Sequence, residues 1–197
     1  SALVVVPYYV RPSEEGCLAH FTKLAELGLP LILYHHPGRT GVKLSTACVE
    51  RLCALPEMVA IKEASGDLNY LMELQTKVSL PILSGDDGLL LAQLSLGCPG
   101  VISVVANVVP RACKQFIRCF ASGDLEQSRA LFFKLYPLIQ ALGLETNPQP
   151  IKYALSQLGR CNPVYRLPLL LPQEKTRLAV DQALMQISDP IAESILQ

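Results

Sequence analysis

The chain has 197 residues, half of them hydrophobic, which is enough to bury a sizeable core in one domain. Basic and acidic residues number 17 each, so the formal net charge is zero. A nucleic-acid-binding protein normally carries a clustered basic excess, and this sequence has none. The composition therefore favours small-molecule chemistry or a structural role over nucleic-acid binding.

The first residues, Ser1–Pro7, are apolar but too few to cross a membrane, and they lack the charged start and cleavage site of a signal peptide. The sequence has seven cysteines, an odd number without a Cys-x-x-Cys pair, and several lie among apolar neighbours. That pattern is not typical of a disulfide framework. We expect no membrane partner, a reducing cytoplasm and buried, inert thiols.

Five short apolar runs predict parallel strands that are buried on both faces, because their apolarity is continuous rather than alternating. The runs are Leu3–Val6, Leu31–Tyr34, Met58–Ile61, Pro81–Leu83 and Gly100–Val104. Helical patterns separate them, and each pattern begins at a residue type that caps helices. These caps are Ser13, Ser45, Asp67 and either Asp86 or Asp87. A spacing of about 20 to 28 residues suits the βα repeat of a TIM barrel.

Beyond Pro110 the sequence predicts helices alone. They are Ala112–Phe120, Leu125–Leu142, Pro150–Leu158 and Glu174–Ile187. We therefore predict five βα units over residues 1–122 and a helical region, residues 123–197, packed on them. Five strands cannot close an eight-stranded barrel. Either the sheet is open and doubly wound, or three βα units precede Ser1, which the start inside an apolar strand favours.

Residues suited to chemistry lie where predicted strands end, the edge at which parallel α/β folds place their sites. Lys62 follows the third strand, and loss of hydration there would lower its pKa and free a neutral amine to attack a carbonyl. Tyr34 lies at the matching level one strand earlier, and Tyr8 and Tyr9 follow the first strand; phenols of this kind can relay a proton. Arg39, in the turn Pro37–Gly41, could hold a carboxylate with two parallel hydrogen bonds. Each has an ordinary alternative: a lysine that reaches out to water, amphipathic core tyrosines and a solvated loop arginine.

The three histidines do not show the spacing of metal ligands. His35 and His36 adjoin on an extended segment and point to opposite sides, and His20 lies on a predicted helix. A site that combines a histidine with Asp86 and Asp87 stays open as an alternative. Those aspartates are better explained as a helix cap and a first-turn charge.

Several motifs, in order, resemble the dihydrodipicolinate synthase family of pyruvate-dependent aldolases. PYYVRPS from Pro7 is similar to the family's PYYNRPS, YHHPGRTG from Tyr34 to YNVPGRTG, and IKEASGD from Ile61 to the Schiff-base motif of the same letters. LSGDD, GVISVVAN, ETNP and RLP follow later in the chain, so the resemblance extends from Val4 to about Ile187. It implies a TIM (β/α)8 barrel, here a partial barrel of five βα units plus C-terminal helices.

By this resemblance, Lys62 condenses with pyruvate, and the resulting enamine attacks aspartate semialdehyde on the route to lysine and diaminopimelate. Tyr34 is implied as the proton-transfer phenol, and Tyr9 as a relay tyrosine that reaches the neighbouring subunit's site. The family further implies a homotetramer or dimer and a covalent imine without a metal or organic cofactor. An open array of five strands also predicts association, because its edges and inner face lack partners.

For substrate binding, the resemblance implies that Arg39 holds the semialdehyde carboxylate and that the backbone around Gly85 and Ile102 lines the pyruvate pocket. Sialic-acid lyases and other pyruvate aldolases share the lysine strand. They usually lack the pattern that Arg39 begins, Arg-Thr-Gly, so that pattern favours the synthase.

The sequence departs from the family at Val10 and His35, where asparagine is usual. The family's first three βα units, with the GTTGE loop that binds the pyruvate carboxylate, are not in this sequence. A catalytically inactive partial barrel that acts as an assembly partner is therefore the rival hypothesis.

Overall fold

The computed structural model describes residues 1–187. The chain divides into two compact units, Ser1–Ile102 and Ser103–Gln197. The division predicted from the sequence, after residue 122, follows the end of the expected βα repeats and stays a prediction.

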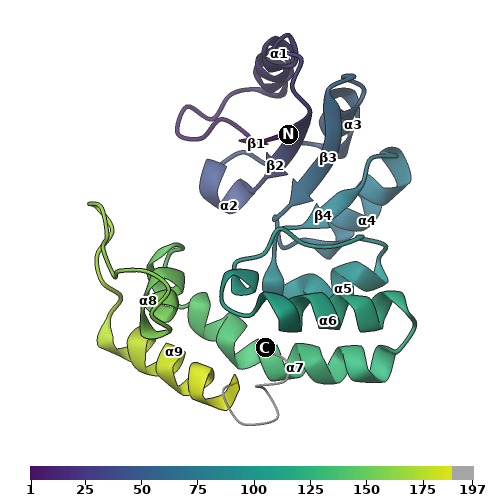
Figure 1. Ribbon diagram of the computed structural model, residues 1–197. Coiled ribbons are helices and arrows are strands. Elements are labelled where there is room, and N and C mark those ends of the chain that lie inside the picture. Colours follow the sequence, from purple (N-terminus) through teal and green to yellow (C-terminus); the bar gives the residue numbers. More distant parts are fainter. Residues whose placement is uncertain (188–197) are drawn as a thin grey trace. The chain divides into compact units, whose positions relative to one another are not determined.

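The first unit is built on a parallel sheet whose four strands lie side by side in chain order (Figure 1). The strands are β1 (Ala2–Val5), β2 (Leu31–His35), β3 (Met58–Glu63) and β4 (Ile82–Ser84). The order and position of these four are confirmed. The fifth predicted strand, Gly100–Val104, is wrong: Val101 forms only an isolated bridge with Ser84. The chain turns soon afterwards, where the Ser103 hydroxyl accepts a hydrogen bond from the Ala106 N–H at 2.9 Å.

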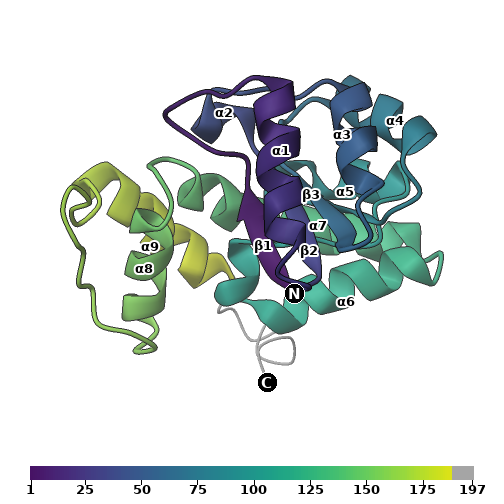
Figure 2. The same cartoon turned by 90° about the horizontal axis from the view of Figure 1, so that it is seen from above.

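Three helices pack on one face of the sheet, as Figures 1 and 2 show. They are α1 (Glu14–Ala25), α3 (Thr46–Cys53) and α4 (Leu68–Lys77). Phe21, Leu52 and Leu71 from these helices meet Leu33 and Ile61 of the sheet in a fully buried core. The opposite face is only partly buried, which corrects the prediction of strands buried on both sides. In a closed barrel that face would be covered by strands across the barrel, and four strands leave it partly open.

The pairing of β2 with β3 contains one irregularity. Leu31 pairs with Met58, but the next residue, Ile32, pairs with Ala60, so Val59 has no partner on β2. An extra residue of this kind reverses which side chains face which side of the sheet. Beyond it the two strands stay in register to their ends.

The four helix starts predicted from cap residues are confirmed. In each, a side-chain oxygen accepts a hydrogen bond from a backbone N–H of the first turn, which satisfies a donor that the helix leaves unpaired. The caps are Ser13 for α1, Ser45 for α3, Asp67 for α4 and Asp86 for the short 3₁₀ turn η1 (Asp87–Leu89), which leads into α5 (Leu90–Ser95). The predicted turn at Pro37 closes into a one-turn helix, α2 (Pro37–Thr40), which ends at Gly41 with φ of 71°.

The second unit is helical in its described part. Its elements are the 3₁₀ turn η2 (Val105–Asn107), α6 (Pro110–Ala121), α7 (Leu125–Leu142), α8 (Gln149–Gln157) and α9 (Glu174–Ile187). The bounds of α7 and α9 are those predicted, and those of α6 and α8 differ by one or two residues. Leu138, Ala154 and Val180 form the centre of a separate apolar core. Within the described residues, no helix is both long enough and apolar enough to span a bilayer.

Candidate active site at the ends of strands β2 and β3

Lys62 and Tyr34 lie next to each other on neighbouring strands. They are direct partners in the parallel pairing of β3 with β2, so their side chains project from the same face of the sheet. Lys62 Nζ lies 4.1 Å from the centroid of the Tyr34 ring, within the range of a cation–π contact. The prediction that the lysine and the tyrosine share one level is confirmed.

The surroundings of this pair favour the neutral form of both groups. Partial burial lowers the pKa of Lys62 below its ordinary value, the Asp87 carboxylate opposes this shift, and the Arg39 guanidinium adds to it. Burial raises the pKa of Tyr34, and Arg39 partly offsets that change. Lys62 therefore has more of the nucleophilic free amine than an exposed lysine, while Tyr34 keeps the proton that it could donate.

Gly85 lies close against the Lys62 side chain. A Cβ added to Gly85 would lie 2.6 Å from Ala64 Cβ, 2.9 Å from the Glu63 carbonyl oxygen and 3.0 Å from Lys62 Cε. The Gly85 N–H donates a hydrogen bond to that same carbonyl at 2.7 Å. Only glycine lets the end of β4 come this close to the lysine stem. Ile102 donates its N–H to the Ser84 carbonyl at 2.9 Å, so it too lies beside the end of β4.

Arg39 and Tyr9 line an open cavity of about 660 Å³. Its other lining residues are Arg11, Gly38, Thr40 and Gly41. Tyr9 is 90% exposed and has a positive φ of 67°, so its phenol stands out from the surface. The Arg39 charge acts on the pKa of both Lys62 and Tyr34, so Arg39 lies within electrostatic range of that pair. The structure thus brings Lys62, Tyr34 and Arg39 together and places Tyr9 with Arg39.

A model of the dihydrodipicolinate synthetase family matches residues 1–187. The chain belongs to that family. The match confirms the resemblance seen in the motifs, and the fold is that of a partial (β/α)8 barrel.

Known members of the family are similar over most of this chain. The 4-hydroxy-tetrahydrodipicolinate synthase of Methanothrix thermoacetophila is 42% identical over 193 residues, 96% of this chain and 65% of that protein. That of Leptospira biflexa is 45% identical over 177 residues, 88% of this chain and 60% of that protein. The solved structure of the enzyme from Methylacidiphilum fumariolicum SolV matches with a TM-score of 0.94 at 37% identity, covering 99% of this chain and 67% of that chain. This chain therefore spans about two thirds or less of the length of the curated relatives.

His35, one of the departures from the family pattern, forms a buried pair with Glu63 on the helix-facing side of the sheet. The His35 Nε2 accepts a hydrogen bond from the Leu44 N–H at 3.3 Å, so Nδ1 carries the proton and donates it to Glu63 Oε2 at 2.6 Å. Glu63 Oε1 accepts the Ser65 N–H at 2.6 Å. The imidazole also stacks on Tyr70, with ring centroids 5.0 Å apart.

This pair joins β2 to β3 directly behind Tyr34 and Lys62, and reasoning from the sequence missed it. The sequence did carry a signal for it. Side chains alternate between the two faces of a strand, and Glu63 follows Lys62 as His35 follows Tyr34, so Glu63 and His35 share the face opposite to Lys62 and Tyr34. The prediction that His35 and His36 point to opposite sides is confirmed, because the His36 ring meets the Tyr34 ring on the other face.

Metal binding and thiol chemistry find less support in the described residues. In the part of the chain that the structure describes, no group of three or more histidine, cysteine, aspartate or glutamate residues could hold a metal ion. The seven cysteines are free thiols. Burial raises the pKa of Cys48 and Cys98 to about 11 and that of Cys53 to about 12, so their thiolates are scarce at neutral pH.

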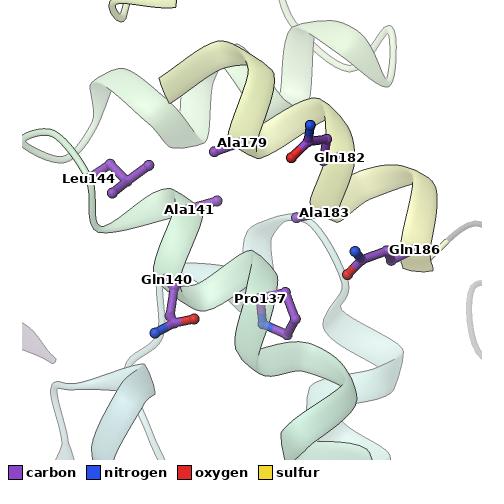
Figure 3. A pocket seen from close by; sticks show the side chains of 8 residues that line it. All are labelled: Pro137, Gln140, Ala141, Leu144, Ala179, Gln182, Ala183 and Gln186. Atoms are coloured by element: carbon purple, nitrogen blue, oxygen red, sulfur yellow. The ribbon is translucent and has the colours of Figure 1, made fainter. Parts of the chain in front are cut away.

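A second cavity, of about 230 Å³, lies between α7 and α9 in the second unit (Figure 3). Its lining consists of Pro137, Gln140, Ala141, Leu144, Ala179, Gln182, Ala183 and Gln186. None of these side chains is titratable or nucleophilic, so this cavity offers no group for imine chemistry. The chemistry-bearing residues lie at the carboxyl ends of the strands in the first unit.

Proposed function

We propose that Lys62 forms a Schiff base with pyruvate and that the derived enamine condenses with aspartate semialdehyde, as in lysine and diaminopimelate biosynthesis. The observation that carries this proposal is the position of Lys62 Nζ, 4.1 Å from the Tyr34 ring centroid and with a lowered pKa. The relatives named 4-hydroxy-tetrahydrodipicolinate synthase support it.

The first half of the reaction builds the imine. The neutral Lys62 amine attacks the keto carbon of pyruvate and gives a carbinolamine. The Tyr34 phenol donates the proton with which the carbinolamine hydroxyl leaves as water, and the nitrogen lone pair forms the C=N bond. The protonated imine withdraws electrons from the adjacent methyl group, which loses a proton and leaves an enamine.

In the second half, the enamine carbon attacks the aldehyde carbon of the semialdehyde. A C–C bond forms, and the aldehyde oxygen takes up a proton. The amino group of the former semialdehyde then attacks the imine carbon, which closes the ring and releases Lys62 as the free amine. Because the protonated imine is itself the electron sink, this sequence needs no metal or organic cofactor.

The remaining site residues have roles in this scheme that their positions support. Arg39 lines the open cavity and would hold the semialdehyde carboxylate with paired hydrogen bonds. Tyr9 is exposed, as a phenol that reaches a neighbouring subunit must be, and this exposure fits a homodimer or homotetramer. The biosynthetic role of the family supports a location in the cytoplasm. The backbone of Gly85 and Ile102 beside β4 would line the pyruvate pocket.

Borohydride reduction in the presence of pyruvate tests the proposal, because it converts the imine into a stable adduct. We expect a single adduct, mapped to Lys62 by peptide mass spectrometry. Trapping should be slow in this chain, because the family's carboxylate-binding GTTGE loop is not in its sequence. Lys62→Ala should abolish the adduct, and Tyr34→Phe should slow its formation without removing it.

Lys23→Ala is the matched control, since Lys23 is exposed and pairs with Glu26 at 2.5 Å. It should trap pyruvate as the unchanged chain does. An adduct on Lys23 or Lys152, or one spread over many lysines, would contradict Lys62 as the nucleophile. If no lysine is labelled, the chain is the inactive partial barrel of the rival hypothesis.

A further inference from the structure

His36 adds a polar group to the face of the sheet that carries Lys62. It follows the end of β2, two residues after Tyr34, and its ring meets the Tyr34 ring edge-on with centroids 5.8 Å apart and an interplanar angle of 65°. The Tyr34 ring thus contacts both the Lys62 ammonium and the His36 imidazole. In the family motif YNVPGRTG, the residue at this position is a valine, which has no hydrogen-bonding atom.

The same imidazole lies beside the cavity that Arg39 lines. A Cβ added to Gly38, a lining residue, would lie 3.3 Å from His36 Cε1, so the ring packs directly over Gly38. On the same cavity, Arg11 Nε lies 2.7 Å from the place that a Gly41 Cβ would take. Two guanidinium groups therefore line this cavity, and the His36 imidazole packs against Gly38, one of its lining residues. Guanidinium and imidazole N–H groups are donors suited to an anion.

The surroundings of His36 decide which of its ring nitrogens can donate a hydrogen bond. Its Nδ1 atom is buried and, among the residues that the structure describes, has no hydrogen-bond partner. Burial lowers the pKa of His36, and the charges of Arg39 and Lys62 lower it further, against smaller opposite effects of Glu63 and of the residue's own backbone. The ring is therefore neutral at pH 7. A proton on Nδ1 would be a buried donor without an acceptor, so the neutral ring carries its proton on Nε2, which is the nitrogen that can donate to a ligand.

We propose that His36 is a substrate-binding residue that donates a hydrogen bond to the carboxylate that Arg39 holds on the aldehyde substrate. The inference rests on the proposed function and adds to it a residue that the family motif does not supply. A neutral imidazole adds no charge beside the guanidinium, but it gives the carboxylate a second, directional donor. The contact makes the site selective for an aldehyde with a carboxylate over an apolar aldehyde of similar length.

The test compares His36→Val with the unchanged chain in two reactions with pyruvate. Aspartate semialdehyde is one acceptor, and propanal, which lacks the amino and carboxylate groups, is the other. We expect His36→Val to raise the KM for aspartate semialdehyde about tenfold, the worth of one hydrogen bond to a charged group. The rate of pyruvate trapping on Lys62 and the reaction with propanal should change less than about twofold.

Two further variants keep the test decisive. His36→Asn retains an N–H donor and should bring the KM for the semialdehyde back to within about threefold of the unchanged value. His20→Val removes an exposed histidine on α1 and should change nothing. Thermal unfolding of each variant shows whether it is folded. If His36→Val does not fold, the comparison of His36→Asn with His36→Leu replaces it.

The outcomes separate the two levels of inference. If the unchanged chain forms no imine, the proposed function and this contact fail together. If it forms the imine but His36→Val leaves the KM for the semialdehyde unchanged, only the contact is overturned. Equal losses with both aldehydes, or slower pyruvate trapping, would also overturn the carboxylate contact, because His36 would then act on the reacting centre instead.

Discussion

The two faces of the β2–β3 pair carry polar side chains that are neighbours in sequence but have opposite surroundings. On the helix-facing side, Glu63 and His35 are fully buried and satisfy each other and nearby backbone groups. On the other side, Lys62 and Tyr34 are half-buried, and burial shifts their pKa values toward the neutral forms. A buried polar group with its partners in place holds strands together, whereas a half-buried group with a shifted pKa is available for chemistry.

Glu63→Leu should break the structural side of this comparison and have the largest effect. It leaves the buried His35 Nδ1–H and the partly buried Ser65 N–H without their acceptor, so we expect the free energy of unfolding to fall by about 3 kcal/mol. Urea unfolding followed by circular dichroism measures it. The matched control is the preceding residue: Lys62→Met should change stability by less than about 1 kcal/mol while abolishing pyruvate trapping. Equal destabilisation by both variants would refute the division of roles between the two faces.

Gly85→Ala tests how far the reactive side depends on close packing. The added methyl group would lie 2.6 Å from Ala64 Cβ and 3.0 Å from Lys62 Cε, so the lysine stem must move. We expect a loss of about 1–3 kcal/mol in stability and pyruvate trapping slowed about tenfold, measured by unfolding and by adduct mass. Gly100→Ala is the control, because its Cβ would meet only Leu83 Cδ2 at 3.9 Å. Trapping at the unchanged rate in Gly85→Ala would show that the lysine is not held by this contact.

The pH dependence of pyruvate trapping gives the smallest effect and the finest comparison. The rate should rise with pH through the Lys62 pKa, with a midpoint below that of an ordinary lysine at about 10.4. Asp87 favours the ammonium, so Asp87→Asn should move the midpoint to lower pH. Arg39 disfavours it, so Arg39→Gln should move the midpoint to higher pH. Shifts in the same direction for both variants would show that these charges do not act on Lys62.

Much of the fold could be read from the sequence because its signals are local. Continuous apolar runs marked the first four strands, and Ser13, Ser45 and Asp67 marked helix starts that the structure confirms. The level shared by Tyr34 and Lys62 followed from equal positions at the ends of two strands. The fifth run has the apolarity of a strand, but the chain turns at Ser103. Composition does not reveal where the pairing between neighbouring strands stops.

The buried pair and the surroundings of His36 could not be predicted from residue types alone. Whether Glu63 meets His35 depends on how two strands pair, which is a long-range property. Likewise, the state of His36 depends on Gly38, Arg39 and Lys62 together. Single residues at strand ends therefore gave the candidates, and only the folded arrangement separated the fully buried pair from the half-buried candidates.

The unpaired residue Val59 has a consequence for how this site can change. If the pairing instead continued without a bulge, Ile32 would pair with Val59, and Lys62 would lie opposite His35 rather than Tyr34. The amine would then enter the helix-facing core, and the carboxylate of Glu63 would reach the open side. Deletion of Val59 itself would keep Lys62 opposite Tyr34, because Ile32 would still pair with Ala60, whereas a slip of the pairing by one residue would exchange the positions of the amine and the carboxylate. The bulge at Val59 thus lets Met58 join the helix-facing core while Lys62 stays beside Tyr34.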